Sequence, residues 1–357
     1  MATAMMAMPA VATTTNTTET KEQYPSLIRS EDILLEGNMR LVNQINVDSE
    51  VLCLRYNHNG KLLAIGLTTG TIMIYSVESK AFVYVLRHGS PSSVPVTSMK
   101  WKPEGPDEEY GYQLMATYVS GEVKTWHVTT GSCLKSHKED DVQLLVGAYN
   151  SSGSHCIAGG HNGCIYLYDE ITGRKISTLG PSVNKEVMDG HVMRVFALQY
   201  HPLDENVFVS GGWDNTIQWW DTRTSDRYSI KKISGPRICG EGLDIEKNTQ
   251  KLVAVSWRRH QNCQVFDFGS GKRIKEMDAY GKSSMLYCAQ WKDRSSLIVG
   301  GSNGHIVSLA DYNTGLTIGS ALNLPGGVCA LDNTRIGSHP SIAAASGKHI
   351  LVVSDDV

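Results

Sequence analysis

The chain has 357 residues, and its 33 Lys and Arg nearly balance its 36 Asp and Glu, for a formal net charge of −3. This balance argues against a protein that binds nucleic acid or membrane surfaces mainly through net positive charge. No apolar run approaches the roughly 20 residues that a membrane-spanning helix needs. We therefore expect neither a membrane protein nor one that recognises nucleic acid.

The first 30 residues are rich in Met, Ala and Thr, and no Lys or Arg precedes Lys21. A secretory signal starts with positive charge and a mitochondrial presequence carries Arg, so neither is predicted. With little apolar surface to bury, residues 1–30 are predicted to be a disordered tail. The eight Cys form no C-x-x-C pair and the His lack H-x-x-x-H spacing, so we expect no metal and no cofactor. Unpaired thiols favour a reducing compartment, cytoplasmic or nuclear.

Beyond the tail, a pattern of strand, Gly-containing turn and strand recurs every 42 to 52 residues. Internal repetition at such a period is typical of propellers and solenoids. The recurring segments are Ala64–Ser76, Ala116–His127, Ala158–Asp169, Ser210–Asp221, Val255–Asp267, Val299–Ala310 and Ala345–Ser354.

Each repeat is predicted to contain four strands, most clearly in the fourth. Its strands are expected at residues 195–200, 207–209, 216–220 and 228–233, where β-branched and aromatic residues lie between Gly, Asn, Asp and Pro turns. The seventh repeat ends soon after residues 350–353 and has no fourth strand of its own. Residues 39–45 form an unassigned strand, which we expect to complete that last unit and close the ring.

The fourth repeat resembles a WD repeat. It contains Gly190-His191, Ser210-Gly211, Asp214, Thr216-Ile217 and Trp220-Asp221, which match the family pattern G-H … S-G-x-x-D-x-T-I-x-x-W-D. The resemblance implies an all-β fold across residues 39–357: one seven-bladed β-propeller of four-stranded antiparallel blades, closed by the N-terminal strand.

His191, Ser210 and Asp214 are also the residue types of a hydrolytic triad. In WD propellers the matching residues instead form a hydrogen-bond chain within a blade. The resemblance implies this structural role for His191, Ser210, Asp214 and Trp220, because buried polar groups must satisfy one another. A propeller hydrolase is the less favoured alternative, and no catalytic residue is predicted.

A partner-binding face is predicted where the turns between the second and third strands gather around the channel. Arg and Trp are enriched at binding hot spots, and Arg suits carboxylate or phosphate groups. We expect an acidic or phosphorylated peptide there; ordinary turn variation, with Trp213 packed on a neighbouring loop, is the alternative. The residues in question are His161, Trp213, Trp257, Arg258, Arg259 and His260.

Trp220, Asp221 and Arg223, with Ile217, spell I-x-x-W-D-x-R. This resembles the motif by which WD-repeat substrate receptors engage the adaptor of cullin-4 ubiquitin ligases. The resemblance as a whole implies a non-catalytic scaffold for protein or peptide partners, with a cullin-4 substrate receptor as one form of it. A structural subunit of a trafficking, checkpoint or chromatin complex is the alternative.

Overall fold

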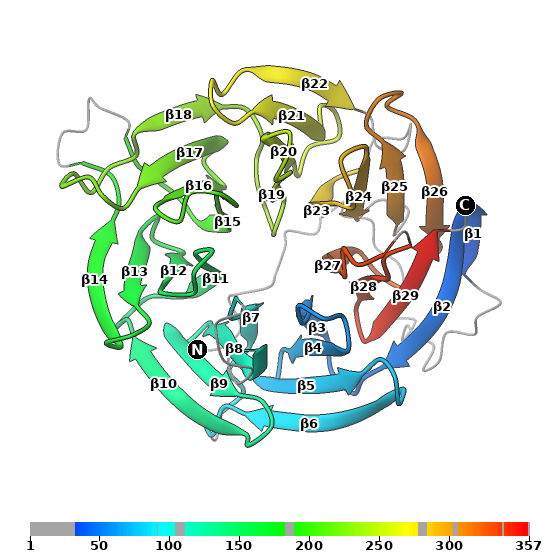
Figure 1. The fold of residues 1–357 in the computed structure, drawn as a ribbon, viewed down its shortest axis with the longest axis horizontal. Coiled ribbons are helices and arrows are strands. Elements are labelled where there is room, and N and C mark those ends of the chain that lie inside the picture. The colour runs from blue at the N-terminus through cyan, green and yellow to red at the C-terminus, as the bar shows by residue number, and fades with distance from the viewer. Residues whose placement is uncertain are drawn as a thin grey trace, which may run out of the picture. The chain divides into compact units, whose positions relative to one another are not determined.

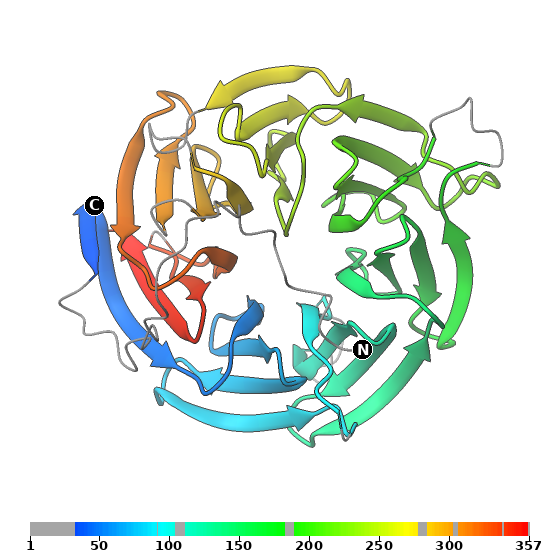
Figure 2. The same cartoon turned by 180° about the vertical axis from the view of Figure 1, so that it is seen from behind.

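In a computed structural model, residues 33–90, 92–103, 111–182, 189–277, 284–302, 306–337 and 339–355 are described. The predicted tail, residues 1–30, lies outside these ranges. From residue 33 onward the strands form seven antiparallel sheets arranged in a ring around a central axis (Figure 1). Figure 2 shows the same ring from its other face. The predicted seven-bladed propeller is thus confirmed.

The first four blades follow the chain from the innermost strand to the outermost. Blade one contains β3 (Val51–Tyr56), β4 (Leu62–Leu67), β5 (Thr71–Ser76) and β6 (Ala81–Arg87). Blade two contains β7 (Val96–Trp101), β8 (Gln113–Tyr118), β9 (Glu122–His127) and β10 (Ser132–Lys138). Blade three contains β11 (Leu144–Tyr149), β12 (His155–Gly160), β13 (Ile165–Asp169) and β14 (Arg174–Leu179). Blade four contains β15 (Val195–Tyr200), β16 (Val207–Gly212), β17 (Thr216–Asp221) and β18 (Lys231–Ser234).

The last three blades follow the same order, except that the outermost strand of blade seven comes from the start of the chain. Blade five contains β19 (Leu243–Ile245), β20 (Lys251–Val255), β21 (Cys263–Asp267) and β22 (Arg273–Met277). Blade six contains β23 (Leu286–Trp291), β24 (Ser296–Gly301), β25 (Val307–Asp311) and β26 (Thr317–Leu322). Blade seven contains β27 (Val328–Asn333), β28 (Ile342–Ser346) and β29 (His349–Asp355), and β2 (Met39–Asn46) is its outermost strand.

The ring is closed as predicted, because β2 pairs antiparallel with β29. The sequence did not predict a second closing strand. β1 (Leu34–Gly37) pairs with β26 and adds a fifth strand to blade six. The start of the chain therefore ties the last two blades together, and Figure 1 shows β1 and β2 running along their outer edge.

The apolar core is divided among the seven interfaces between neighbouring blades. One cluster joins blades one and two through Ile72, Val96 and Leu114, and another joins blades three and four through Val146 and Phe208. The other interfaces have equivalent clusters. Each fully buried large side chain contributes about 1.5–3 kcal/mol, so the stability of the ring is spread over its whole circumference.

Lysines on the outer strands also join one blade to the next. Lys231 in β18 donates to the Gly269 carbonyl oxygen at 2.9 Å, and Lys275 in β22 donates to that of Asn313 at 2.8 Å. Lys135 in β10 occupies the same position and bonds the Glu170 carbonyl. In each case an ammonium group holds carbonyl oxygens in the outer turn of the following blade. Among the described residues, no helix is long and apolar enough to cross a membrane.

Candidate functional site

His191, Ser210, Asp214 and Trp220 lie within hydrogen-bonding distance of one another in blade four. The His191 ring nitrogens are 2.6 Å from Ser210 Oγ and 2.9 Å from Asp214 Oδ2. Trp220 donates its indole N–H to Ser210 Oγ at 2.7 Å. Burial alone would raise the pKa of Asp214, but hydrogen bonds from His191, from Thr216 and from a backbone N–H outweigh it and lower that pKa.

The burial of this chain does not suit hydrolysis. His191 and Ser210 are both fully buried, and the Ser210 hydroxyl oxygen already accepts the Trp220 indole N–H. A nucleophile must reach a substrate carbonyl, and no substrate atom can approach Ser210 without opening the blade. The arrangement is suited instead to holding β16 and β17 in register with the loop that carries His191.

Trp213 and Trp257 occupy the same position in successive blades, at the start of the turn between the second and third strands. The Trp213 backbone N–H donates to the Arg194 carbonyl oxygen, and the Trp257 N–H donates in the same way to that of Arg237. Their rings lie 5.4 Å apart between centroids, and Phe196 lies 5.9 Å from Trp213. All three side chains are partly exposed. An aromatic strip therefore crosses this face from blade four to blade five.

Two arginines converge beside the aromatic strip on one neutral oxygen. Asn215 Oδ1 accepts from Arg237 Nε at 2.9 Å and from Arg258 Nη2 at 3.0 Å. The Arg237 guanidinium also lies over the Trp213 ring, with its Cζ 5.4 Å from the centroid. Among the described residues neither guanidinium forms an ion pair with a carboxylate. In the part of the chain that the structure describes, two positive charges thus meet without a compensating anion.

Asn215 has the backbone conformation that makes this geometry possible. Its φ is +61°, and Gly121 and Gly163 hold the matching turn positions in blades two and three with φ of +88° and +83°. Asn is among the few residues other than Gly that tolerate this region. Unlike Gly, it supplies a side-chain oxygen to the two arginines.

The structure brings together only some of the residues predicted for this face. Trp213, Trp257 and Arg258 belong to one cluster, which the sequence-based prediction did not extend to Phe196, Arg237 or Asn215. Arg259 and His260 are exposed at the tip of the blade-five turn. His161 stands on blade three in the position of Trp213, but its ring accepts from the Gln143 backbone N–H at 3.0 Å, and no contact within the described residues joins it to the cluster.

Trp220, Asp221 and Arg223 lie toward the opposite end of β17 from this face. Trp220 is buried, whereas the Arg223 side chain is 56% exposed. The Arg223 guanidinium folds back onto Asp221, with Nη2 2.7 Å from Oδ2, and lies 3.3 Å from Asp204. Hydrogen bonding from Arg223 lowers the pKa of Asp221. Arg223 is thus accessible but already paired within its own blade.

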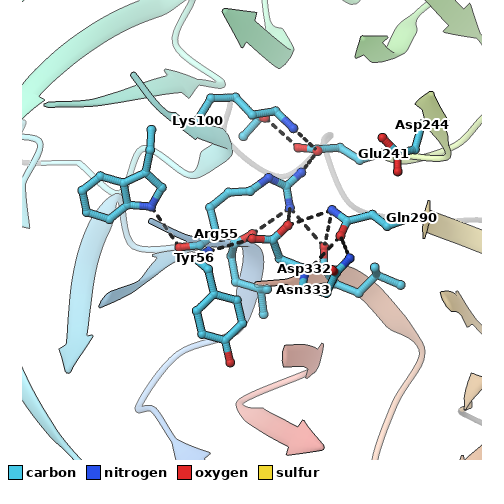
Figure 3. A network of polar contacts seen from close by, with 12 residues as sticks. Arg55, Tyr56, Lys100, Glu241, Asp244, Gln290, Asp332 and Asn333 are labelled. Carbon is cyan, nitrogen blue, oxygen red and sulfur yellow. Dashed lines mark hydrogen bonds and ion pairs between the residues drawn. The ribbon is translucent and has the colours of Figure 1, made fainter. Parts of the chain in front are cut away.

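The sequence-based prediction missed a polar network among the innermost strands, where Glu241 of blade five reaches across the ring (Figure 3). Its carboxylate forms an ion pair with Arg55 of blade one, lies 2.8 Å from the Lys100 ammonium and accepts from Ser98 Oγ at 2.7 Å. Burial, and then the neighbouring Arg55 guanidinium, lower the pKa of Lys100 well below its usual value. Glu241 is therefore the anion that offsets two cations at the centre of the ring.

The network continues from Arg55 into blades six and seven. Asp332 accepts from the Tyr56 backbone N–H at 2.7 Å and from the Gln290 side-chain amide at 2.8 Å. The Gln290 oxygen in turn accepts from Asn333 Nδ2 at 2.8 Å. Figure 3 shows these groups arranged around the Arg55 guanidinium. The inner strands of non-adjacent blades are thus linked by charge as well as by packing.

Glu241 reaches across the ring because blade five has an insertion. The Ile238 N–H donates to the Gly212 carbonyl just as the Leu286 N–H donates to that of Ser256, which makes Ile238 and Leu286 equivalent. Leu243 in β19 and Ala289 in β23 are likewise equivalent by their strand pairing. Four residues lie between Ile238 and Leu243 in blade five, but only two lie between Leu286 and Ala289 in blade six, so blade five has two extra residues. The extra residues shorten β19 and carry Glu241 inward.

A sequence signal for this network existed in the repeats themselves. The penultimate residue of the innermost strand is polar in six of the seven blades, although these strands are otherwise mostly apolar. These residues are Arg55, Lys100, Gln199, Asp244, Gln290 and Asp332, with Ala148 as the exception. Aligning the first strands of the repeats would have exposed the pattern, whereas the reach of Glu241 depends on an insertion and would not have appeared.

Comparison with known families and proteins agrees with the fold. Residues 31–104 match the model of the anaphase-promoting complex subunit 4 WD40 domain, and residues 183–221 match that of the WD domain, G-beta repeat. WD repeat-containing protein 25 of Mus musculus is 28% identical over 39% of this chain and 24% of its own length. Cell division cycle 20.1 of Arabidopsis thaliana, a cofactor of the APC complex, is 22% identical over 70% of this chain and 52% of its own length.

A third relative is the WD repeat-containing protein slp1 of Schizosaccharomyces pombe, 20% identical over 76% of this chain and 51% of its own length. The chain therefore spans between about a quarter and about half of the length of these relatives. Two of these three relatives are named as WD repeat-containing proteins, and the repeat matched in this chain lies in its fourth blade. With its seven blades and its matched repeat, the chain belongs to the WD-repeat family.

Proposed function

We propose that this propeller is a protein-interaction scaffold and that the face shared by blades four and five binds an acidic or phosphorylated peptide. The observation that carries the proposal is the convergence of Arg237 and Arg258 on the single neutral oxygen of Asn215. A carboxylate or phosphate is a stronger acceptor than an amide oxygen and would replace it as partner of both guanidiniums.

The aromatic strip supports the same proposal, because it supplies an apolar contact next to the charged one. Trp213 and Trp257 are partly exposed. The loop whose Arg194 carbonyl accepts from the Trp213 N–H also carries Val192 and Met193, which are 63% and 41% exposed. Exposed aromatic and arginine side chains at one place are the composition of binding hot spots. We expect the peptide to place an apolar side chain on the strip and its anionic group between the arginines.

The test is binding of the purified full chain to arrays of short peptides bearing Glu, phosphoserine or Lys at otherwise matched positions. We expect acidic and phosphorylated peptides to bind preferentially, and the double variant Arg237→Ala with Arg258→Ala to lose at least tenfold in affinity. Arg223→Ala is the matched control and should bind as wild type. Equal binding of acidic and basic peptides, or unchanged affinity in the double variant, would overturn the proposal.

A second candidate concerns the opposite end of β17. The I-x-x-W-D-x-R sequence and the exposure of Arg223 support docking of a cullin-4-type ligase adaptor, which would make the chain a substrate receptor. Affinity purification of wild type beside Arg223→Ala separates this role from the peptide site. Recovery of the adaptor with wild type and its loss with Arg223→Ala is the expected result. A wild-type purification without adaptor removes the candidate.

The alternative of a structural subunit in a larger assembly draws on two similarities. One matched family model is that of an anaphase-promoting complex subunit, and one relative is named as a cofactor of that complex. Size-exclusion chromatography of the tagged chain from cell extract tests this alternative. Co-elution with a stable set of subunits, unaffected by Arg223→Ala, favours it over the adaptor role, whereas elution at the size of the free chain rejects it.

A further inference from the structure

The outermost strand of blade one differs from every other outer strand when all seven are compared in register. Val85 in β6 pairs with Met73 in β5 and is 44% exposed. The structurally equivalent residue is polar in each of the other six blades. These residues are Gln44, Ser136, Thr178, Lys232, Glu276 and Ser320.

Phe82 extends the difference along the same strand. It pairs with Tyr75 and is 38% exposed. Lys175 and Arg273 hold the equivalent position in blades three and five, and Leu41 holds it in blade seven. Val83, 42% exposed, lies at a bulge that the outer strands of several blades share, so it adds apolar area without being distinctive. Residues 81–86 of β6 contain no charged side chain at all.

Stretches of six uncharged residues occur in two other outer strands. Residues 41–46 of β2 are one, and β2 also ends its sheet, but it carries the polar Gln44 at the position of Val85. β26 has no charged residue, and β1 pairs along its edge with Leu34 opposite Leu322. The outer strands β10, β14, β18 and β22 carry two or more charged residues each and end their sheets. Charged side chains protect exposed edges from pairing with other strands. β6 has a single charged residue, Arg87 at its end, and no covering strand within the described residues.

We propose that the β6 edge is an interface with a second copy of this chain, in which the two β6 strands pair antiparallel about Tyr84 to form a symmetric dimer. This pairing sets Phe82 opposite Leu86 and Val83 opposite Val85, so apolar residues meet apolar residues. The same pairing by β10, β18 or β22 would place Lys135, Lys231 or Lys275 opposite its own copy. A symmetric contact uses one patch on both copies, and the β6 edge supplies such a patch.

The dimer is independent of the peptide face on blades four and five. One strand pair buries less area than obligate dimers do, so the association is weak and depends on concentration. It joins two four-stranded blades into one continuous sheet, as β1 extends blade six within the chain.

Sedimentation velocity of the full chain over a range of concentrations tests the proposal. Wild type is expected to shift from monomer to dimer, and Val85→Lys is expected to raise the dimer dissociation constant at least tenfold. Thr178→Lys, at the same position in blade three, is the matched control and should dimerise as wild type. A wild type that stays monomeric throughout, or a Val85→Lys that dimerises normally, overturns the proposal.

Cysteine crosslinking keeps the test independent of the effect of Val85→Lys on folding. Tyr84 lies on the proposed two-fold axis, so Tyr84→Cys should give a disulfide-linked dimer on mild oxidation. Ser177→Cys, its equivalent in blade three, is the control for random collision and for the exposed thiol of Cys133. Equal yields of crosslinked dimer from the two variants would contradict pairing through β6.

Discussion

Blades four and five are neighbours on the ring, yet they are held together differently. Blade four contains the buried chain from His191 to Trp220, whereas blade five has Ala254 and Phe266 at the positions of Ser210 and Trp220. Blade five instead ties its turn to the next blade, because Asn262 donates to the Ser284 carbonyl at 2.7 Å. The turn of blade five is therefore anchored to blade six instead of to a buried chain within its own blade.

That difference bears on binding. The turn of blade four spans residues 213–215, whereas that of blade five spans residues 256–262 and exposes Arg258 and Arg259. The short turn supplies Trp213 and Asn215 in fixed positions, and the long turn supplies charge. The peptide face that we propose thus combines a short turn from blade four with a longer, exposed turn from blade five.

The largest effect is expected from removing the internal support of blade four. His191→Ala leaves Ser210 and Asp214 without their shared partner in a buried site, and it opens a cavity. We expect the free energy of unfolding to fall by about 3 kcal/mol, measured by urea denaturation. His260→Ala, in the exposed turn of blade five, is the control and should change little. A His191→Ala variant as stable as wild type would remove the structural role of the chain.

The next effect should come from the ion-pair network that Glu241 of blade five forms with blades one and two. Glu241→Gln leaves Arg55 and Lys100 without their shared anion at the centre of the ring. Breaking a largely buried ion pair leaves uncompensated charge, and we expect a loss of about 2 kcal/mol in the same denaturation measurement. Adding Lys100→Met to Glu241→Gln removes one of the stranded charges and should recover part of the loss. A double variant less stable than Glu241→Gln alone would show that Lys100 acts mainly through packing.

Features that recur in every blade could be predicted from the sequence, whereas features that occur once could not. The repeat period, the blade count and the closure by residues 39–45 follow from strand patterns that each blade repeats. β1 was not predicted, because it is four residues long and its pairing with β26 depends on how the ring brings distant segments together.

The candidate site was predicted only where it lies in a motif or a conspicuous turn. Trp213 and Trp257 could be found because aromatic residues in turns are unusual. Arg237 and Phe196 could not, because they come from segments that meet these turns only in the folded ring. The role of Glu241 is harder still to predict, because its contacts depend on a two-residue insertion that is absent from the repeat pattern.

Blades four and five should differ in the pH at which acid reduces their contribution to stability, because each contains one carboxylate with a lowered pKa. Burial alone would raise the pKa of Glu246 in blade five, but hydrogen bonds from Thr249 and Asn248 outweigh it and lower that pKa to about 2. A lowered pKa stabilises the fold above the unfolded-state value of 4.5, and this contribution is lost as the pH falls from there toward about 2. The pKa of Asp214 in blade four is lowered from 3.8, so its contribution is lost only at more acidic pH.

Urea denaturation at a series of pH values below about 5 checks this difference. Wild type should lose stability progressively on acidification, and Glu246→Gln should show a flatter dependence beginning near pH 4.5. Asp214→Asn should flatten the dependence only below about pH 3.8. Identical pH profiles for wild type and Glu246→Gln would contradict the assignment of acid sensitivity to this turn.

The smallest effect concerns the contact that joins the two blades. Lys231 of blade four lies 4.2 Å from the Trp219 ring centroid and donates to the Phe268 and Gly269 carbonyls of blade five. Lys231→Met keeps most of the apolar stem but removes the ammonium group, so we expect a loss of about 1 kcal/mol. Lys232→Met, on the same strand, is the matched control. Lys275 and Lys135 form the same lysine-to-carbonyl contact between other blades. An equal loss in Lys231→Met, Lys275→Met and Lys135→Met would show that this contact stabilises the whole ring rather than the interface of blades four and five alone.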